Sequence, residues 1–351
     1  MATSDPVLAE RIARHGFATR PAADAVTAAA MVCGIQAQDP QASRLGVRAR
    51  STGVTEKDVL AAIEQRCVVR TWLMRNTIHL VPADDVRWMT ALLGPMIRRR
   101  FEAVRWPELG LTPELLDRAA AVTPAILAGR ALTRQEFAAQ LGQHGVAIAQ
   151  EGQASTHVLL YLSAVGLTCR GTDLGREATF VLIDDWIPDA AAGPRGDDAL
   201  AELARRFFTG FSPATPADFT TWSGLPSSRA ITLIRDELTA ADVHGRAGYR
   251  LGIVEPQRGL RMLPAFDNYL VGYKERAALI ADDRRAEVYV GGVIRPTVLL
   301  DGRVVGRWQL DRAKGRVQVL EFERLSRSAR SAIDAEVADT GAFLDQELAI
   351  D

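Results

Sequence analysis

Two glutamines near the start of the chain have the residue type and spacing to form a small polar site. Gln36 and Gln38 flank Ala37 in the stretch GIQAQDPQAS, directly after an Ala-rich run. Their carboxamides can orient a water or a polar ligand by hydrogen bonds, but they do not titrate at neutral pH. Two interpretations are open. The pair is either a helix end that satisfies backbone carbonyls, or a site that needs two neutral amides side by side.

Other common catalytic patterns are missing from the sequence. It contains no GxGxxG and no P-loop, so we expect no dinucleotide or ATP cofactor. The stretch WSGLPSS has serines but lacks the G-x-S-x-G arrangement of a nucleophile elbow. No two histidines stand four residues apart and no two cysteines form C-x-x-C, so we expect no metal site.

Cysteine usage and hydropathy indicate the compartment. The three cysteines, at positions 33, 67 and 169, are odd in number and far apart, which is typical of reduced thiols in the cytoplasm. The first residues form no apolar signal-peptide core, and no run of uncharged apolar residues is long enough to cross a membrane. We expect a cytoplasmic protein with no membrane partner.

The net charge of −1 hides an asymmetry along the chain. Residues 1–110 hold 15 Lys and Arg against 11 Asp and Glu, a balance of +4; the rest holds 27 against 32, a balance of −5. Arginine clusters occur in RLGVRAR and IRRR. These clusters are either solvated helix faces or contacts to phosphate, which the planar guanidinium suits.

The N-terminal third has the element order of a winged helix. Helices are predicted at 6–15, at 21–33 and at 55–66. Thr19 and Pro21 are the expected start of the second helix, and Pro40 is expected to stop it. A β-rich stretch at 67–81 with a turn near its middle then predicts a hairpin.

The same order recurs twice. Capped helices begin at Thr133 and Thr215 with the shared pattern T-x-x-[DE]-F, about 80 residues apart, which suits small tandem domains. The second round contains predicted helices at 113–128 and 152–167, followed by two short β-rich runs. The third begins at 196 and ends with predicted strands at 242–245 and 248–254.

A β-rich region begins near residue 254. β-rich runs are predicted at 286–300, 303–310 and 316–323, with Asp301-Gly302 as a hairpin turn and a final helix at 326–347. The predicted fold class is therefore α+β. Its units are three tandem winged helices at 1–110, 111–192 and 193–253, followed by a β-rich C-terminal domain at 254–351.

Four segments carry a resemblance to a known family. In chain order they are GIQAQDPQASRLGVRARS, VVRTWLMRNTIHLVPADDVRW, GFSPATPADFTTWSGL and LPAFDNYLVGYKER. Together they resemble the winged-helix DNA glycosylases of the AlkZ type, over nearly the whole chain. The resemblance implies that the units form a C-shaped cradle. It also implies excision of alkylated purines from double-stranded DNA, including bulky N7 adducts and interstrand crosslinks, in base excision repair.

The resemblance also assigns roles to the glutamines. The family signature is glutamine, an apolar residue, glutamine, which Gln36, Ala37 and Gln38 match. A purine alkylated at N7 or N3 is cationic and departs without a strong general acid. Two amides then suffice to hold a water near C1′. Asp39 is a competing carboxylate, which we interpret as a cap of the turn before Pro40.

Candidate DNA contacts lie on three further stretches. Each carries an alternative: an arginine that is merely solvated, or a ring that belongs to the core. The candidates are Arg44, Arg48 and Arg50 for phosphate, Arg75, Asn76 and His79 on the first hairpin for the minor groove, and Asp267 and Tyr269 for the cradle.

Two functions from different classes remain at this point. The first is a monofunctional DNA glycosylase that acts as a monomer with water as nucleophile and associates with the nucleoid when bound to DNA. The second is a non-enzymatic regulator or a protein that sequesters a genotoxin. Base release from N7-adducted DNA separates them, because only the enzyme leaves an abasic site.

Overall fold

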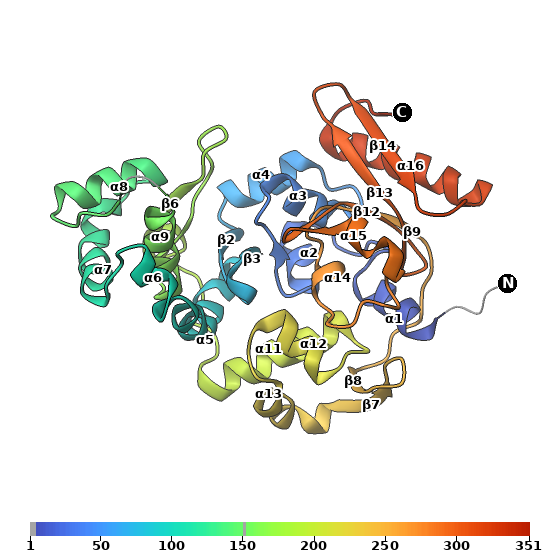
Figure 1. Cartoon of the computed structure of the whole chain (residues 1–351), viewed down its shortest axis with the longest axis horizontal. Coiled ribbons are helices and arrows are strands. Elements are labelled where there is room, and N and C mark those ends of the chain that lie inside the picture. Colours follow the sequence, from blue (N-terminus) through green and yellow to red (C-terminus); the bar gives the residue numbers. More distant parts are fainter. Residues whose placement is uncertain (1–4, 150–151) are drawn as a thin grey trace. The chain divides into compact units, whose positions relative to one another are not determined.

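The computed structural model describes residues 5–149 and 152–351, which fall into two compact units (Figure 1). Unit 1 contains the chain up to Ala61 together with Ala201–Asp351, and unit 2 is Ala62–Leu200. The chain passes between the units within two helices, α4 (Glu56–Glu64) and α11 (Gly196–Phe211). Among the described residues, no helix is both long and apolar enough to cross a membrane.

The first two helices of unit 1 begin at aspartate caps. Helix α1 (Pro6–Arg14) confirms the predicted helix, and its cap is Asp5. Helix α2 (Ala25–Met31) is shorter than predicted, and the expected start at Thr19 and Pro21 is wrong. Asp24 caps α2 instead, because its carboxylate accepts a 2.7 Å hydrogen bond from the Thr27 amide.

A third helix, α3 (Pro40–Arg48), was not predicted. Pro40 does not stop the preceding helix, which already ends at Met31. It is the first residue of α3, where its missing N–H costs no hydrogen bond. Asp39 is the N-cap of this helix. The sequence Asp-Pro carried that signal, since a capping residue followed by proline is a helix start.

The C-terminal part of unit 1 is β-rich and confirms the predicted α+β class. Its five-stranded sheet has the order β15-β14-β13-β12-β9, antiparallel except for the parallel pair β14 and β15. Asp301 and Gly302, both with positive φ, form the predicted turn. The strands are β9 (Leu260–Leu263), β12 (Thr297–Leu300), β13 (Arg303–Asp311), β14 (Arg316–Glu321) and β15 (Ala349–Ile350).

Helix α16 (Arg327–Leu344) confirms the predicted final helix and packs against β9. The β-rich run predicted at 286–300 contains three short strands. The chain there forms a helical turn, α15 (Arg285–Val288), and a small hairpin before β12 begins. Two glycines with positive φ make the hairpin turn. The short elements of this stretch are α14 (Asn268–Val271), η3 (Asp282–Arg284), β10 (Tyr289–Val290) and β11 (Val293–Ile294).

The remainder of unit 1 carries the third predicted helix–hairpin set. The capping box of Thr215 and Asp218 is confirmed. The strand expected at 242–245 is wrong, because His244 and Gly245 have positive φ and form the turn between the two strands. The elements are α12 (Pro216–Ser223), α13 (Ser227–Leu233), η2 (Arg235–Glu237), β7 (Leu238–Asp242) and β8 (Ala247–Leu251).

Unit 2 contains a sheet in the order β3-β2-β5-β6-β4. Helix α5 packs against α9 closely at Gly94, where a side chain would collide with the Ala164 carbonyl. The capping box of Thr133 and Glu136 is confirmed. Its strands are β2 (Val68–Trp72), β3 (Ile78–Pro82), β4 (Leu132–Thr133), β5 (Thr168–Arg170) and β6 (Thr179–Leu182). Its helices are η1 (Met74–Asn76), α5 (Ala83–Glu102), α6 (Arg105–Glu108), α7 (Pro113–Leu127), α8 (Arg134–Gln143), α9 (Ala154–Ala164) and α10 (Ile183–Trp186).

The division into three winged helices stays a prediction. As the sequence predicts, helices followed by a hairpin occur three times, and the hairpins are β2–β3, β5–β6 and β7–β8. The two compact units cut across these sets, since unit 1 joins the first helices of the chain to its C-terminal half.

Candidate active site

The two glutamines lie between a short strand and the start of a helix. Gln36 belongs to β1 (Ile35–Gln36), and Gln38 precedes the α3 cap by one residue. The pair therefore does not end a helix, because α2 already ends at Met31. The role of the two carboxamides stays a prediction. The two side chains differ in environment: Gln36 is only 6% exposed, whereas Gln38 is exposed.

Asp39 is occupied as the cap of α3. Its Oδ1 accepts hydrogen bonds from the amides of Gln41 at 2.9 Å and Ala42 at 3.0 Å. These bonds orient the first turn of α3 directly after Gln38. The capping role predicted for Asp39 is confirmed, although the capped element is a helix rather than a turn before Pro40.

A residue of α14 forms hydrogen bonds to the backbone of the segment that carries the glutamines. The Asn268 side chain accepts a hydrogen bond from the backbone N–H of Gln36 at 3.2 Å and donates one to the backbone carbonyl of Gly34 at 2.8 Å. Asn268 is fully buried. Sequence reasoning singled out Asp267 and Tyr269 on either side of it and missed Asn268, because a buried asparagine carries no pattern that a sequence alone displays.

Arg50 and Asp267 form a buried ion pair. Two guanidinium nitrogens of Arg50 each lie 2.9 Å from a carboxylate oxygen of Asp267, and neither side chain is exposed. Tyr269 is also fully buried, and its hydroxyl donates to the Gly302 carbonyl at 2.9 Å. Burial leaves these three residues no surface for DNA. For them we propose a structural role in place of the predicted DNA contact.

A neutral histidine completes this buried cluster. His15 Nδ1 lies 3.4 Å from an Arg50 guanidinium nitrogen, and its Nε2 lies 3.2 Å from the Tyr273 hydroxyl. Burial lowers the pKa of His15 well below its usual value, and the charges of Arg50 and Arg11 lower it further. The imidazole therefore stays uncharged at neutral pH and leaves Asp267 to neutralise Arg50.

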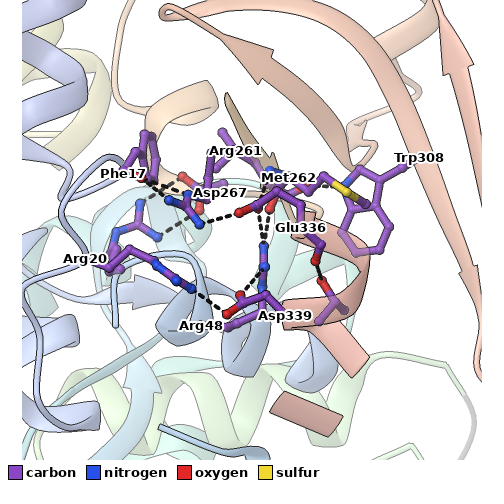
Figure 2. A network of polar contacts seen from close by, with 12 residues as sticks. Phe17, Arg20, Arg48, Arg261, Met262, Asp267, Trp308, Glu336 and Asp339 are labelled. Carbon is purple, nitrogen blue, oxygen red and sulfur yellow. Dashed lines mark hydrogen bonds and ion pairs between the residues drawn. The ribbon is translucent and has the colours of Figure 1, made fainter. Parts of the chain in front are cut away.

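Arg48 belongs to a second buried network, which ties α3 to the C-terminal helix (Figure 2). Its guanidinium contacts Glu336 at 3.2 Å and Asp339 at 2.8 Å, both on α16, and donates to the Met262 carbonyl at 2.6 Å. The carboxylate of Glu336 also binds Arg261. Arg48 is therefore a structural cation here, and we propose this role for it in place of phosphate contact.

The network favours the ionised form of the Asp339 carboxyl. Burial raises the pKa of the Asp339 carboxyl, but the hydrogen bond from Arg20 and the charges of Arg48 and Arg20 outweigh burial and lower it. Arg261 connects the network to the loop after α1, because its guanidinium also donates to the Phe17 carbonyl. The network thus joins the loop after α1, helix α3, strand β9 and helix α16.

Arg44 remains partly exposed. Its Nε lies 2.8 Å from Glu56, which also receives Arg312. Burial raises the pKa of the Glu56 carboxyl, and hydrogen bonds from Arg312 and Arg44 lower it to a net value below its usual one. Two arginines thus share one carboxylate, so this cluster keeps a surplus of positive charge. Arg44 stays a candidate for phosphate contact.

The predicted hairpin of unit 2 is confirmed with its turn. Arg75 and Asn76 lie between β2 and β3, and both have positive φ. His79 is fully buried; its Nδ1 donates to the Thr77 carbonyl at 3.0 Å, while its Nε2 lies 3.4 Å from an Arg75 nitrogen. Burial, then the charge of Arg75, lowers the pKa of His79 to about 3. For His79, which is buried against Arg75, we propose a role in orienting Arg75 in place of the predicted groove contact. The groove contacts of Arg75 and Asn76 stay predictions.

A cavity of about 370 Å³ opens beside the first turn of α3. It starts at Asp39, directly after Gln38, and runs past Leu45 to Ala265 and Trp308. The Trp308 indole is held in place, since its N–H donates to the Leu263 carbonyl at 2.8 Å. The volume lies within the range of small-molecule sites, about 300–1,000 Å³. The cavity was not predicted, because its walls come from four separate stretches of chain.

Comparisons with known proteins show which family and which enzymes this chain is similar to. Residues 29–343 match the family model described as DNA glycosylase AlkZ-like. An interstrand DNA cross-link repair glycosylase of Streptomyces sahachiroi is 28% identical, covering 95% of this chain and 94% of that protein. The solved structure of Streptomyces sahachiroi DNA glycosylase AlkZ superposes with a TM-score of 0.85 and 26% identity, covering 100% of both chains.

These findings define an enzyme class and then a family. The chain is a DNA N-glycosylase, an enzyme that hydrolyses the bond between a base and its deoxyribose, and DNA is its substrate. It belongs to the AlkZ-like DNA glycosylase family. The resemblance found in the sequence is thereby confirmed, and the non-enzymatic alternative is not supported.

Proposed function

We propose that the protein is a monofunctional glycosylase for cationic alkylated purines, with Gln36 and Gln38 positioning the attacking water. The supporting observation is the placement of two neutral amides on one segment that buried contacts hold at the start of α3. Gln38 is exposed and reaches substrate directly, whereas Gln36 lies deeper and orients the water from the protein side.

The chemistry requires no titrating side chain. As the glycosidic bond breaks, its electron pair moves to the purine and neutralises the positive charge that alkylation created. The water oxygen bonds to C1′ and releases a proton to solvent, which leaves a free base and an abasic site. An amide oxygen that accepts a hydrogen bond from the water supplies orientation, and the amide dipole stabilises the developing sugar cation.

We extend the proposal to bulky adducts and crosslinks. The relative from Streptomyces sahachiroi is an interstrand DNA cross-link repair glycosylase. In this chain, the cavity next to Asp39 has room and apolar walls, including Leu45 and Trp308, for a group attached to the purine.

Base excision on a small panel tests the proposal. Duplexes carrying N7-methylguanine, a bulky N7 adduct or an N7 crosslink are incubated with the protein, which we propose acts as a monomer. Released base and abasic sites are then measured. The control is the double variant Gln36→Ala/Gln38→Ala, which is expected to bind DNA without releasing base. Failure of the wild-type protein to release base from all three duplexes contradicts the proposal.

A further inference from the structure

We propose that Asn268 is a positioning residue whose carboxamide fixes the backbone that carries Gln36 and Gln38. The inference rests on the proposed function of that pair, and it concerns a residue that is fully buried. Asn268 opens helix α14, more than 200 positions from the glutamines in the chain, yet its side chain lies directly against their segment.

The segment before Gln36 depends on side-chain hydrogen bonding. Cys33 and Gly34 both have positive φ and turn the chain out of α2. Their amides bond back to the helix, to the carbonyls of Ala30 at 3.0 Å and Ala29 at 2.8 Å. Those bonds leave other backbone groups of this turn to be satisfied by a partner from elsewhere, since buried polar backbone groups need one.

Asn268 serves three of these groups with one carboxamide. Its Oδ1 accepts a hydrogen bond from the backbone N–H of Gln36 at 3.2 Å. Its Nδ2 donates to the backbone carbonyls of Gly34 at 2.8 Å and Val32 at 3.4 Å. A side-chain amide presents a donor and an acceptor side by side, as a neighbouring β-strand does. Asn268 therefore acts as a short replacement for a strand next to residues 32–36.

We call Asn268 with its three hydrogen bonds to residues 32–36 the clamp. The clamp is itself connected to α3. Asp267, the neighbour of Asn268, caps α14 through the Tyr269 amide at 2.9 Å and binds Arg50 just beyond α3. Arg50 in turn donates to the Gly46 carbonyl at 2.9 Å. The short α14 segment thus holds both sides of the catalytic stretch: the turn before Gln36 through Asn268, and the far end of α3 through Asp267.

Residue chemistry separates this role from ordinary packing. Aspartate has the shape of asparagine and can still accept from the Gln36 amide. It cannot donate to Gly34 or Val32, and it places negative charge against their carbonyls. A displacement of the amides by about 1 Å is enough to cost up to about 100-fold in rate, because positioning is what they contribute.

The test compares Asn268→Asp with a matched control, Ser223→Ala. Ser223 is also fully buried in unit 1, donates to the Phe219 carbonyl at 2.7 Å and accepts from the Leu225 amide at 3.0 Å, far from the glutamines in the chain. The measurements are the single-turnover rate of N7-methylguanine release, the Kd for undamaged duplex, the melting temperature, and hydrogen exchange of peptides covering 32–38.

The proposal expects Asn268→Asp to lower the single-turnover rate by at least about tenfold while Kd changes by less than about twofold. Exchange at 32–38 is expected to rise. Ser223→Ala, with a similar fall in melting temperature, is expected to leave rate and exchange as in the wild type. A milder variant, Asn268→Ser, replaces Asn268→Asp if the latter does not fold, and is expected to show the same split.

Two results overturn the clamp: a folded Asn268 variant with wild-type rate and wild-type exchange, or a control that loses rate equally. The exchange measurement does not need a substrate. If the wild-type protein releases none of the cationic bases, the proposed function fails, and exchange at 32–38 still decides whether Asn268 holds the segment.

Discussion

Arg50 and Asp267 are 217 positions apart in the chain and meet in a buried ion pair with two contacts of 2.9 Å. The pair joins the end of α3, the helix that follows Gln36 and Gln38, to the start of α14. The geometry of the N-terminal segment that carries the two glutamines therefore depends on the C-terminal half of the chain. A truncated N-terminal region would contain both glutamines and lack the partners that hold them.

The buried pair gives the first prediction, about stability. Asp267→Ala leaves the Arg50 charge buried without a partner, so the unfolding free energy of unit 1 is expected to fall by about 3–5 kcal/mol. The double variant Arg50→Met/Asp267→Leu removes both charges and is expected to be more stable than the single variant. Urea unfolding measures both. The single variants Arg50→Met and Asp267→Leu complete the cycle, and a double variant that loses as much as the sum of these two would show that the charges do not interact.

The second prediction concerns the side-chain amides of Gln36 and Gln38, which we propose are catalytic. Gln36→Ala and Gln38→Ala are each expected to lower the single-turnover excision rate by about 10²–10⁴-fold, with little change in DNA affinity. The wild-type rate is expected to be flat between about pH 6 and 8, because amides do not titrate. Gln38→Glu introduces a titrating group, and its rate is expected to vary with pH. A bell-shaped wild-type profile would indicate a general acid or base in place of the amides.

The third prediction concerns the cavity beside α3. Ala265 lines it, so Ala265→Phe fills part of the space, whereas Ala265→Ser keeps it open. We expect Ala265→Phe to lower release of a bulky N7 adduct at least about tenfold while N7-methylguanine release changes by less than about threefold. Ala265→Ser is expected to release both at wild-type rates. Equal loss on both lesions in the Phe variant would argue that the cavity does not hold the adduct.

The fourth prediction follows from His79. Its folded pKa of about 3 lies below the value of about 6.5 in the unfolded chain, so the unfolded state binds the proton first. Stability is therefore full above about pH 6.5 and is lost as pH falls toward the folded pKa. Between pH 7 and pH 5 this one histidine is expected to remove about 2 kcal/mol from the unfolding free energy.

The His79 prediction is checked by urea unfolding at several pH values. The variant His79→Gln starts from a lower stability but is expected to lose less between pH 7 and pH 5 than the wild type. His15, buried and neutral in unit 1, contributes with the same sign, so the slope is expected to flatten further in a variant that lacks both. An unchanged slope in His79→Gln would show that His79 accepts a proton in the folded state.

Local features of the fold were predictable because they depend on residues close together in the chain. The capping boxes at Thr133 and Thr215 and the turn at Asp301-Gly302 all formed as expected. The errors also have local causes. Helix α2 begins at Asp24 rather than Thr19, and Asp39-Pro40 starts a helix where proline was interpreted only as a stop.

The roles of the arginines were not predictable from sequence. Arg44, Arg48 and Arg50 are equally basic in the sequence, yet the fold buries two of them against Glu336, Asp339 and Asp267 and leaves Arg44 partly exposed. Whether an arginine is a structural cation or a phosphate contact is decided by carboxylates hundreds of residues away. No local pattern records such a partner.

The amino-acid sequence by itself determined most of the helices and turns and the α+β class, and it supplied the Gln36–Gln38 pair on which the proposed chemistry rests. Hydrogen bonds and side-chain periodicity over a few residues specify these features. Tertiary structure alone decided that Asn268 supports Gln36, that Asp267 neutralises Arg50, and that a cavity opens beside Asp39. Burial and ion pairing depend on which distant segments meet, and that arrangement follows from the packing of the whole chain.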